Sequence, residues 1–292
     1  MISERDVAFY NENGYLTVNN LIGADEVAEL RQATDDLVKA AGQVSAHNEI
    51  YDLEDSHSPS EPRVRRIKTP HKHHKAYAKM VGHPHILSVL QQLWGPSIRF
   101  DVSKLNLKAA GYGAPVEWHQ DWAFYPHTND DLCAIGIMID DVDETNGPLM
   151  VIPGSHKGPI LDHHADAGYF CGAIDPGRQE VDFSNAVALT GSAGSVTIHH
   201  ARTIHGSATN RSGKPRRLLL HQYRAADAWP LLGEDQPWDA FRNHLLSGED
   251  TLSPRMTAVP VRLPLPPAPH QGSIYENQKG STNRYFETAE GL

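Results

Sequence analysis

Residues 116–124 read Val-Glu-Trp-His-Gln-Asp-Trp-Ala-Phe, an alternation of polar and apolar side chains that is typical of a β-strand. Positions i and i+2 of a strand project to the same side, so Glu117, His119 and Asp121 share one face. The opposite face carries Trp118 and Trp122. This stretch therefore predicts a strand that lines a metal site inside a packed β-sandwich.

Short runs with the same alternation lie on both sides of this stretch and are separated by Gly, Pro and Asn. They cover residues 98–107, 132–140, 149–152, 195–200 and 216–223. Before them, three amphipathic segments predict helices. The first starts after the capping residue Ser3, and the other two cover about residues 25–41 and 84–94. Strands collected after helices favour a mainly β fold with flanking helices. We expect a double-stranded β-helix (a cupin-like jelly roll) with an N-terminal helical buttress.

The chain has no internal repeat and no interdomain linker, so we expect one domain over residues 1–292. Helical support is expected over about 1–96, the jelly-roll core over about 97–228 and a C-terminal extension over about 229–292. The polar residues 43–63 predict a mobile loop, and the proline-rich stretch from Ser253 predicts an extended tail.

The composition of the chain limits the kinds of partner that it can bind. The formal net charge is −10, which disfavours nucleic acid, and no apolar run is long enough for a membrane span. The start has no secretory signal, and two cysteines, Cys133 and Cys171, suit a reducing compartment. We expect a cytoplasmic monomer or homodimer that acts on a small molecule.

Histidine is abundant, with 18 residues, and it is the commonest metal ligand. A His-x-Asp or His-x-Glu tripeptide on a strand can place two ligands on one ion. Three such tripeptides occur, beginning at His47, His119 and His164. His119 alone stands in a strand pattern, so His119 and Asp121 are the candidate pair.

An iron(II) site with two histidines and one carboxylate needs a second histidine, and His199, His200 and His205 are available. We prefer His205, because the other two lie at a strand end. Three protein ligands leave room for a bidentate 2-oxo acid and dioxygen, and the far carboxylate of that acid needs a fixed cation. Arg216 begins the next strand and suits that role, whereas Arg217 points to the other side.

At these residues the sequence resembles the phytanoyl-CoA dioxygenase family of iron(II)- and 2-oxoglutarate-dependent oxygenases. The resemblance covers most of residues 5–225 in the order of the family. It is carried by Phe9-x4-Gly14-Tyr15-Leu16, Trp118-His119-Gln120-Asp121, Asn146-Gly147-Pro148-Leu149, Pro153-Gly154-Ser155-His156-Lys157-Gly158, His205-Gly206-Ser207 and Arg216.

The resemblance implies that His119, Asp121 and His205 hold iron and that Arg216 binds 2-oxoglutarate, assisted by Ser207. The other residues that it places near the co-substrate are Lys68 and Lys104, the latter standing where relatives carry glutamine or methionine. Gly136 or Ile137 falls where some relatives carry tryptophan, which implies a reshaped wall. Halogenating relatives lack the carboxylate that Asp121 supplies here, so the resemblance implies hydroxylation, with release of succinate and carbon dioxide.

Two other functions fit part of the pattern. A zinc hydrolase would use the same three ligands with an activated water, although it gives Arg216 no role. A non-catalytic jelly-roll binding protein would keep the site without using it. The substrate itself is not defined by the sequence, and the residues that we expect to line its pocket are Trp122, Tyr125, Gln222 and Arg224.

Overall fold

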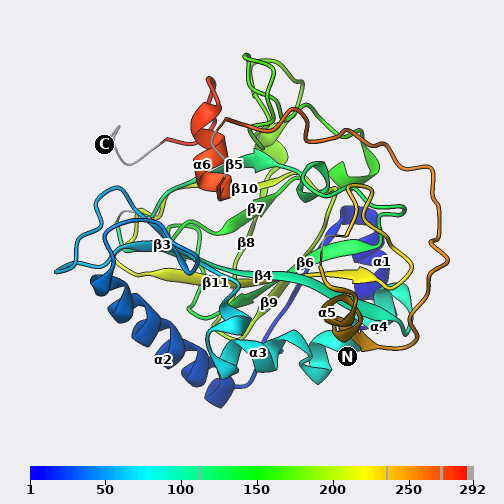
Figure 1. Ribbon diagram of the computed structural model, residues 1–292, viewed down its shortest axis with the longest axis horizontal. Helices are drawn as coiled ribbons and strands as arrows, with labels where there is room; N and C mark the ends of the chain where they lie inside the picture. Colours follow the sequence, from blue (N-terminus) through cyan, green and yellow to red (C-terminus); the bar gives the residue numbers. More distant parts are fainter. Residues whose placement is uncertain (112, 235, 270–271, 288–292) are drawn as a thin grey trace.

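The computed structural model describes residues 1–111, 113–234, 236–269 and 272–287. Two antiparallel sheets face each other, and helices cover the outer face of the larger sheet (Figure 1). The larger sheet has the order β1 (Tyr15–Val18), β9 (Val196–His200), β6 (Leu132–Met138), β11 (Arg216–Ala225), β4 (Ile98–Lys108), β3 (Val64–Lys68) and β2 (Tyr51–Leu53), with β12 (Leu245–Ser247) paired to β4. The smaller sheet has the order β5 (Val116–His119), β10 (His205–Ser207), β7 (Leu149–Val151) and β8 (Val187–Leu189). This arrangement confirms the predicted jelly roll.

Strand β6 shows how one strand serves two cores. Its residues Cys133, Ile135 and Ile137 pack toward the helices, and Ala134 and Met138 pack toward the smaller sheet. A strand that is covered on both faces needs apolar residues at every position, which explains the continuous apolar run in this part of the sequence. The space between the sheets is therefore closed to bulk water on the side of β6.

Three helices form where the pattern predicts them, namely α1 (Glu4–Asn13), α2 (Ala24–Ala40) and α4 (Pro84–Trp94). The structure adds three that were not predicted, namely α3 (Lys75–Val81), α5 (Trp238–Asn243) and α6 (Ile274–Asn277). Ser3 and Asp6 form a reciprocal capping box at the start of α1. Val27 and Leu30 of α2 are buried against the larger sheet, and a fully buried leucine contributes roughly 1.5–3 kcal/mol.

The expected division at residue 96 is wrong in one respect. The first part of the chain also supplies β1, β2 and β3 to the larger sheet. Residues 51–53 lie inside the predicted mobile loop 43–63, yet Tyr51 and Leu53 are buried in the core on the helix side. These two apolar side chains explain why the segment is a strand, because their burial outweighs the polar residues around them.

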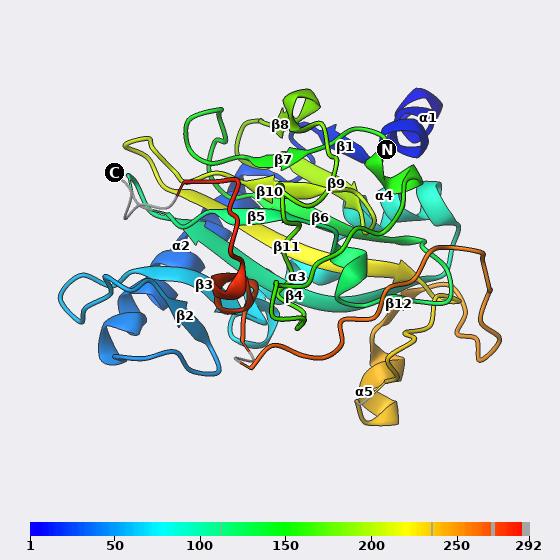
Figure 2. The same cartoon turned by 90° about the horizontal axis from the view of Figure 1, so that it is seen from above.

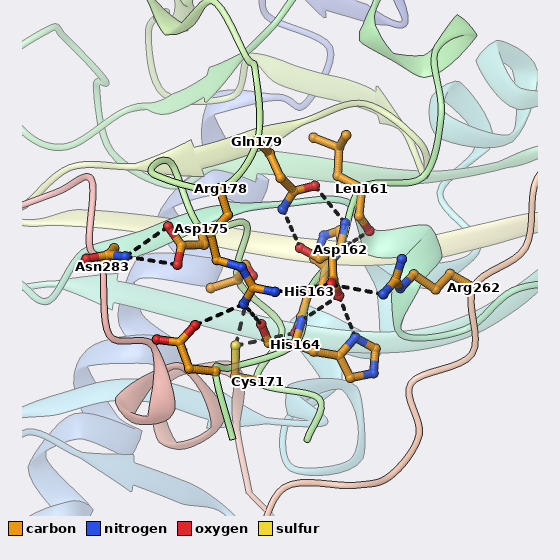
Figure 3. A network of polar contacts seen from close by, with 12 residues as sticks. Leu161, Asp162, His163, His164, Cys171, Asp175, Arg178, Gln179, Arg262 and Asn283 are labelled. Atoms are coloured by element: carbon orange, nitrogen blue, oxygen red, sulfur yellow. Dashed lines mark hydrogen bonds and ion pairs between the residues drawn. The ribbon is translucent and has the colours of Figure 1, made fainter. Parts of the chain in front are cut away.

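The C-terminal part of the chain returns to the site rather than extending away from it. From α5 it runs along the molecule to α6, which lies beside β5 and β10 in Figure 1 and over β4 and β11 in Figure 2. Two polar contacts tie it to the loop after β7, namely Arg262 to Asp162 at 2.9 Å and Asn283 to Asp175 at 3.0 Å (Figure 3). Residues 272–287, called the C-terminal segment below, are thus part of the packed structure.

Cys133 and Cys171 are both free and buried. Across the residues that the structure describes, no helix combines the length and the apolar character that crossing a membrane requires.

Candidate metal centre

His119 and His205 lie on neighbouring strands of the smaller sheet. They are paired directly across β5 and β10, and their ring centroids are 4.0 Å apart. Asp121 follows β5 in a short 3-10 turn, Asp121–Ala123. One ligand atom from each of these three buried residues lies within 4.8 Å of the other two. The strand pairing and the turn therefore bring together two imidazoles and one carboxylate.

The strand predicted over residues 116–124 ends earlier than expected, at His119. The chain turns at Asp121, so the i, i+2 relation does not extend past His119, and Glu117 is not one of the three grouped ligands. The Glu117 carboxylate instead accepts backbone hydrogen bonds from Tyr285 and Phe286. Of the three polar residues predicted to share one face, His119 and Asp121 thus lie at the metal centre, and Glu117 contacts the C-terminal segment.

Backbone carbonyls fix the orientation of both imidazoles. Nδ1 of His119 lies 2.8 Å from the Glu117 carbonyl oxygen, and Nδ1 of His205 lies 2.9 Å from that of Thr203. A carbonyl accepts but cannot donate, so each Nδ1 carries the proton and each Nε2 has a free lone pair. Both Nε2 atoms lie 3.9 Å from the same oxygen of Asp121. This is the arrangement that a divalent metal ion needs.

The protonation states also suit a metal. Burial lowers the pKa of His119 to about 4, and burial and the neighbouring His119 and His199 lower the pKa of His205 well below its ordinary value. Burial alone would raise the pKa of Asp121, but Lys104, His199 and His205 hold it well below its usual range. The centre therefore has neutral imidazoles and an ionised carboxylate, the forms that bind metal.

The two alternative histidines take other positions. Nε2 of His199 lies 3.5 Å from the second oxygen of Asp121, and neither ring nitrogen makes a hydrogen bond within the described part of the chain. His200 points to the opposite side, where its Nδ1 accepts a hydrogen bond from the Arg202 backbone and its Nε2 lies 3.8 Å from Asp130. Of the three candidates, His205 is the one that joins the group of three.

A cavity adjoins the three ligands between the two sheets, and we call it the inner cavity. It is lined by Lys104, Asn106, Val116, His119, Asp121, Ala134, Leu149, His199, His205, Gly206, Ser207, Arg216, Leu218, Leu220 and Ile274. Arg216 is buried at the start of β11, where its Nε and Nη2 donate to the Gly147 carbonyl at 3.0 and 2.7 Å. Burial lowers the pKa of Arg216 to about 10, so it stays charged at neutral pH. Arg216 and Ser207 thus face the space beside the ligands.

The structure shows what surrounds the two positions where relatives carry tryptophan. A Cβ atom on Gly136 would lie 2.6 Å from Oγ1 of Thr197 and 3.2 Å from Leu218, so β6 has no room for a larger side chain there. Ile137 is directed away from the cavity, into the core on the helix side. Neither residue lines the inner cavity, where β6 contributes Ala134.

A second cavity, the outer cavity, has a volume of about 270 Å³ and shares Lys104, Asp121 and Ile274 with the inner one. Its other lining residues are Arg66, Asp101, Val102, Phe124, Tyr125, Gln222, Gly272 and Asn277. Gln222 donates to Asp121 at 3.4 Å and also to the hydroxyl of Tyr125. Two of the predicted substrate residues, Tyr125 and Gln222, therefore lie beside the metal ligands.

The other two predicted substrate residues lie elsewhere. Trp122 is fully buried against Leu132, and its indole N–H donates to the Pro260 carbonyl at 2.9 Å. Arg224 is buried with its guanidinium over the Phe241 ring and donates to the Ala228 carbonyl. Both side chains support the packing of the late part of the chain, so their assignment to the pocket was wrong.

Lys68, expected near the co-substrate, does not line either cavity. Its ammonium lies 3.0 Å from Asp52 and 2.8 Å from the Asn48 carbonyl oxygen. Arg66, two residues earlier on the same face of β3, lines the outer cavity instead. The alternation of β3 could have indicated Arg66, since it has the same parity as Lys68.

Sequence reasoning also missed the residues that come from distant segments. Asn106 shares a face of β4 with Lys104, so strand parity was an available signal for it, and His199, which was considered as a ligand, lines the inner cavity instead. Ile274 and Asn277 had no such signal, because nothing in the pattern placed the C-terminal segment against the site. The other two His-x-acid tripeptides form no metal group among the described residues: His47 contacts Glu276, and His164 contacts Asp162.

Comparison with known proteins agrees with this geometry. The family model described as phytanoyl-CoA dioxygenase (PhyH) matches residues 10–218. A probable alpha-ketoglutarate-dependent hypophosphite dioxygenase from Stutzerimonas stutzeri is 39% identical over 280 residues, covering 95% of this chain and 97% of the relative. An L-proline trans-4-hydroxylase from Streptomyces griseoviridis is 31% identical, covering 76% of this chain and 86% of the relative.

Solved structures have the same fold. EctD from S. alaskensis with bound Fe superposes with a TM-score of 0.64 at 25% identity, covering 90% of this chain and 89% of the other. EvdO2 from Micromonospora carbonacea complexed with 2-oxoglutarate superposes with a TM-score of 0.63 at 26% identity, covering 82% and 97%. The chain therefore belongs to the phytanoyl-CoA dioxygenase family, and it is a dioxygenase that uses iron(II), 2-oxoglutarate and dioxygen.

Proposed function

We propose that His119, Asp121 and His205 hold the iron of this dioxygenase and that the primary substrate enters the outer cavity. The observation that carries the proposal is the convergence of two Nε2 lone pairs on one carboxylate oxygen, at 3.9 Å each. Without a cation these three electron-rich atoms would repel one another, and both Nδ1–H groups are already engaged. When bound, iron and 2-oxoglutarate supply the oxidative decarboxylation that yields succinate and carbon dioxide and drives hydroxylation.

We assign the far carboxylate of 2-oxoglutarate to Arg216 and Ser207. Nη1 of Arg216 makes no hydrogen bond to any residue that the structure describes, while its Nε and Nη2 are held by Gly147. A guanidinium that is fixed on one side presents its remaining donors in a set direction, which suits a carboxylate. The aliphatic side chains of Leu218 and Leu220, which line the same space, limit the access of water.

The substrate end of the site has its own polar groups. Gln222 donates to the second oxygen of Asp121 and to the Tyr125 hydroxyl, and both Gln222 and Tyr125 line the outer cavity. They therefore link the orientation of the Asp121 carboxylate to the occupancy of that cavity. The relative from S. stutzeri is named for hypophosphite, and we propose hypophosphite as the first substrate to test. The volume of about 270 Å³ suits a small molecule.

We further infer that residues 1–292 act as one domain, as a monomer or homodimer without nucleic acid, and that they work in the cytoplasm. The continuous larger sheet, to which the first and middle parts of the chain both contribute, supports one domain. Two buried free cysteines fit the cytoplasm, and a net charge of −10 argues against a nucleic-acid partner.

The assignment of the ligands is tested by Asp121→Ala and His205→Ala. Both variants should lose stoichiometric iron(II) and the visible charge-transfer band with 2-oxoglutarate, and succinate release should fall by at least about 100-fold. His73→Ala, an exposed histidine on the surface, should match the wild type. Full iron binding by both variants would refute the assignment. Hydrolysis by a zinc-loaded protein, without succinate release in the presence of iron, would support the hydrolase alternative.

A further inference from the structure

Strands β3 and β4 carry six buried or partly buried cations, of which four have anionic or carbonyl partners. Arg65 pairs with Glu276, Lys68 with Asp52 and Arg99 with Asp250, and Lys108 donates to the carbonyls of Ser207 and Ala208. Arg66 and Lys104 are the exceptions. Within the described residues, neither side chain makes a hydrogen bond or an ion pair, and Nε of Arg66 is buried without a partner.

The pairing of β3 with β4 brings these two cations to the same place. Arg66 is paired with Asn106 and Lys68 with Lys104, so Arg66 and Lys104 lie on adjacent strands, one diagonal step apart. Both side chains line the outer cavity, and Lys104 also lines the inner one. Burial lowers the pKa of Lys104, Asp121 opposes this shift, and the charge of Arg66 adds to it. Two like charges therefore face one cavity.

Burying a charge without a partner is costly, and two like charges increase the cost. The anion that acts on Lys104 is Asp121, which in the proposed function binds the metal and cannot also neutralise Lys104. Arg216, on the far side of the inner cavity, is a separate cation with its own assignment to 2-oxoglutarate. Arg66 does not line that cavity, so it is available to a different anion.

We propose that Arg66 and Lys104 form the subsite that binds an oxyanion group of the primary substrate. The planar guanidinium offers two parallel donors and the ammonium offers a point charge, a combination that suits a tetrahedral oxyanion. A phosphonate dianion matches the two positive charges better than a carboxylate does. The inference rests on the proposed function only for the position of the iron, and it specifies the chemical class of substrate: a small molecule with an anionic head group.

The test is a calorimetric titration of the full-length protein with methylphosphonate, sodium hypophosphite, acetate and the neutral ester dimethyl methylphosphonate. It is run without oxygen on protein loaded with iron(II) and 2-oxoglutarate, and again on metal-free protein. We expect the phosphorus anions to bind at least about 10-fold more tightly than the neutral ester. Acetate should bind more weakly than methylphosphonate. If acetate bound more tightly than methylphosphonate, the subsite would be assigned to a carboxylate instead of a phosphorus oxyanion.

The variants Arg66→Gln and Lys104→Gln should each raise the Kd for methylphosphonate by about 10-fold or more. Arg66→Lys keeps the charge but loses the two parallel donors, so its Kd should lie between those of the wild type and Arg66→Gln, which separates the charge from a folding defect. Lys79→Gln is the matched control, because it removes one positive charge at a half-exposed side chain that is paired with Glu26. This control should leave the Kd unchanged.

The affinity for 2-oxoglutarate, read from the charge-transfer band, distinguishes this inference from the proposed function. In Arg66→Gln that affinity should stay within about 2-fold of the wild type. Unchanged anion binding in both glutamine variants would overturn the subsite, as would a loss of 2-oxoglutarate affinity without a loss of anion affinity. Absence of the band in the wild type would refute the iron assignment instead, and the titration of the metal-free protein would still decide the subsite.

Discussion

Single carbonyl groups decide what the two histidines of the centre can do. The Glu117 and Thr203 carbonyls each hold one Nδ1, so the ligand atom and the direction of its lone pair are set before any metal arrives. Gly147 does the same for Arg216. At the residue scale, backbone atoms preorganise the site, so the side chains need little rearrangement when the metal and 2-oxoglutarate bind.

Arg216→Lys should lower the affinity for 2-oxoglutarate by about 10- to 100-fold while iron binding is unchanged. An ammonium cannot hold Gly147 with two nitrogens and still present a directed donor to a carboxylate. The measurement is a 2-oxoglutarate titration of the visible band. Arg217→Lys is the control, since Arg217 is next in sequence but points away and pairs with Asp140 and Asp35. Equal affinities in the two variants would argue against the role of Arg216.

The sequence was sufficient for residues whose role follows from strand parity. His119, Asp121, His205 and Arg216 were chosen on local pattern, and the structure places all four at one site. Trp122 was misassigned because burial in a core and burial in a pocket require the same aromatic side chain. The Pro260 carbonyl that fixes Trp122 comes from a segment whose course the pattern did not define.

At the scale of elements, the helices and central strands follow from periodicity, whereas short strands do not. Strand β10 has three residues, His205–Ser207, too few to show any alternation, and it exists because β5 and β7 flank it. The C-terminal segment is another case. Its α6 helix, Ile274–Asn277, is one turn long, too short to be stable by its own propensity, and the next residue, Gln278, anchors the segment through hydrogen bonds with Glu117 and Gly172.

Gln278→Ala should loosen the C-terminal segment. Its amide accepts from the Glu117 N–H at 3.0 Å and donates to the Gly172 carbonyl at 2.9 Å, and the side chain is buried. Loss of these bonds leaves buried polar groups unpaired, at a cost of about 1–3 kcal/mol. Hydrogen exchange of backbone amides in residues 273–286 should become at least about 10-fold faster.

Lys279→Ala is the control for this experiment, because the Lys279 side chain is 49% exposed and its ion pair with Glu276 lies at the surface. Exchange in this variant should resemble the wild type. If Gln278→Ala left the exchange rates unchanged, the segment would be held by its apolar contacts alone.

At the scale of the whole molecule, the abundance of histidine affects stability more than chemistry. His127, His163 and His221 are buried, and burial lowers the pKa of each to about 3. In the unfolded chain the same groups titrate near pH 6.5. Between these two pH values the unfolded state binds protons that the folded state excludes, so stability is complete above about pH 6.5 and falls as the pH decreases.

Urea unfolding should therefore show a marked loss of stability between pH 7 and pH 4.5. Each of these histidines contributes up to about 1.4 kcal/mol per pH unit in that range. His221→Gln removes one titrating group from the core beside Tyr223 and should reduce the slope of stability against pH, even if it lowers stability at pH 7. A slope equal to that of the wild type would show that His221 is not excluded from protonation by the fold.

The position of the C-terminal segment has an evolutionary consequence. The family match ends at residue 218, yet Gly272, Ile274 and Asn277 form part of the wall of the outer cavity. Under the proposed function, selection for a new substrate can act on a few residues near the end of the chain while the residues assigned to iron and 2-oxoglutarate stay constant. Exchange of this segment between related enzymes is a direct route to chimeras with altered substrate range.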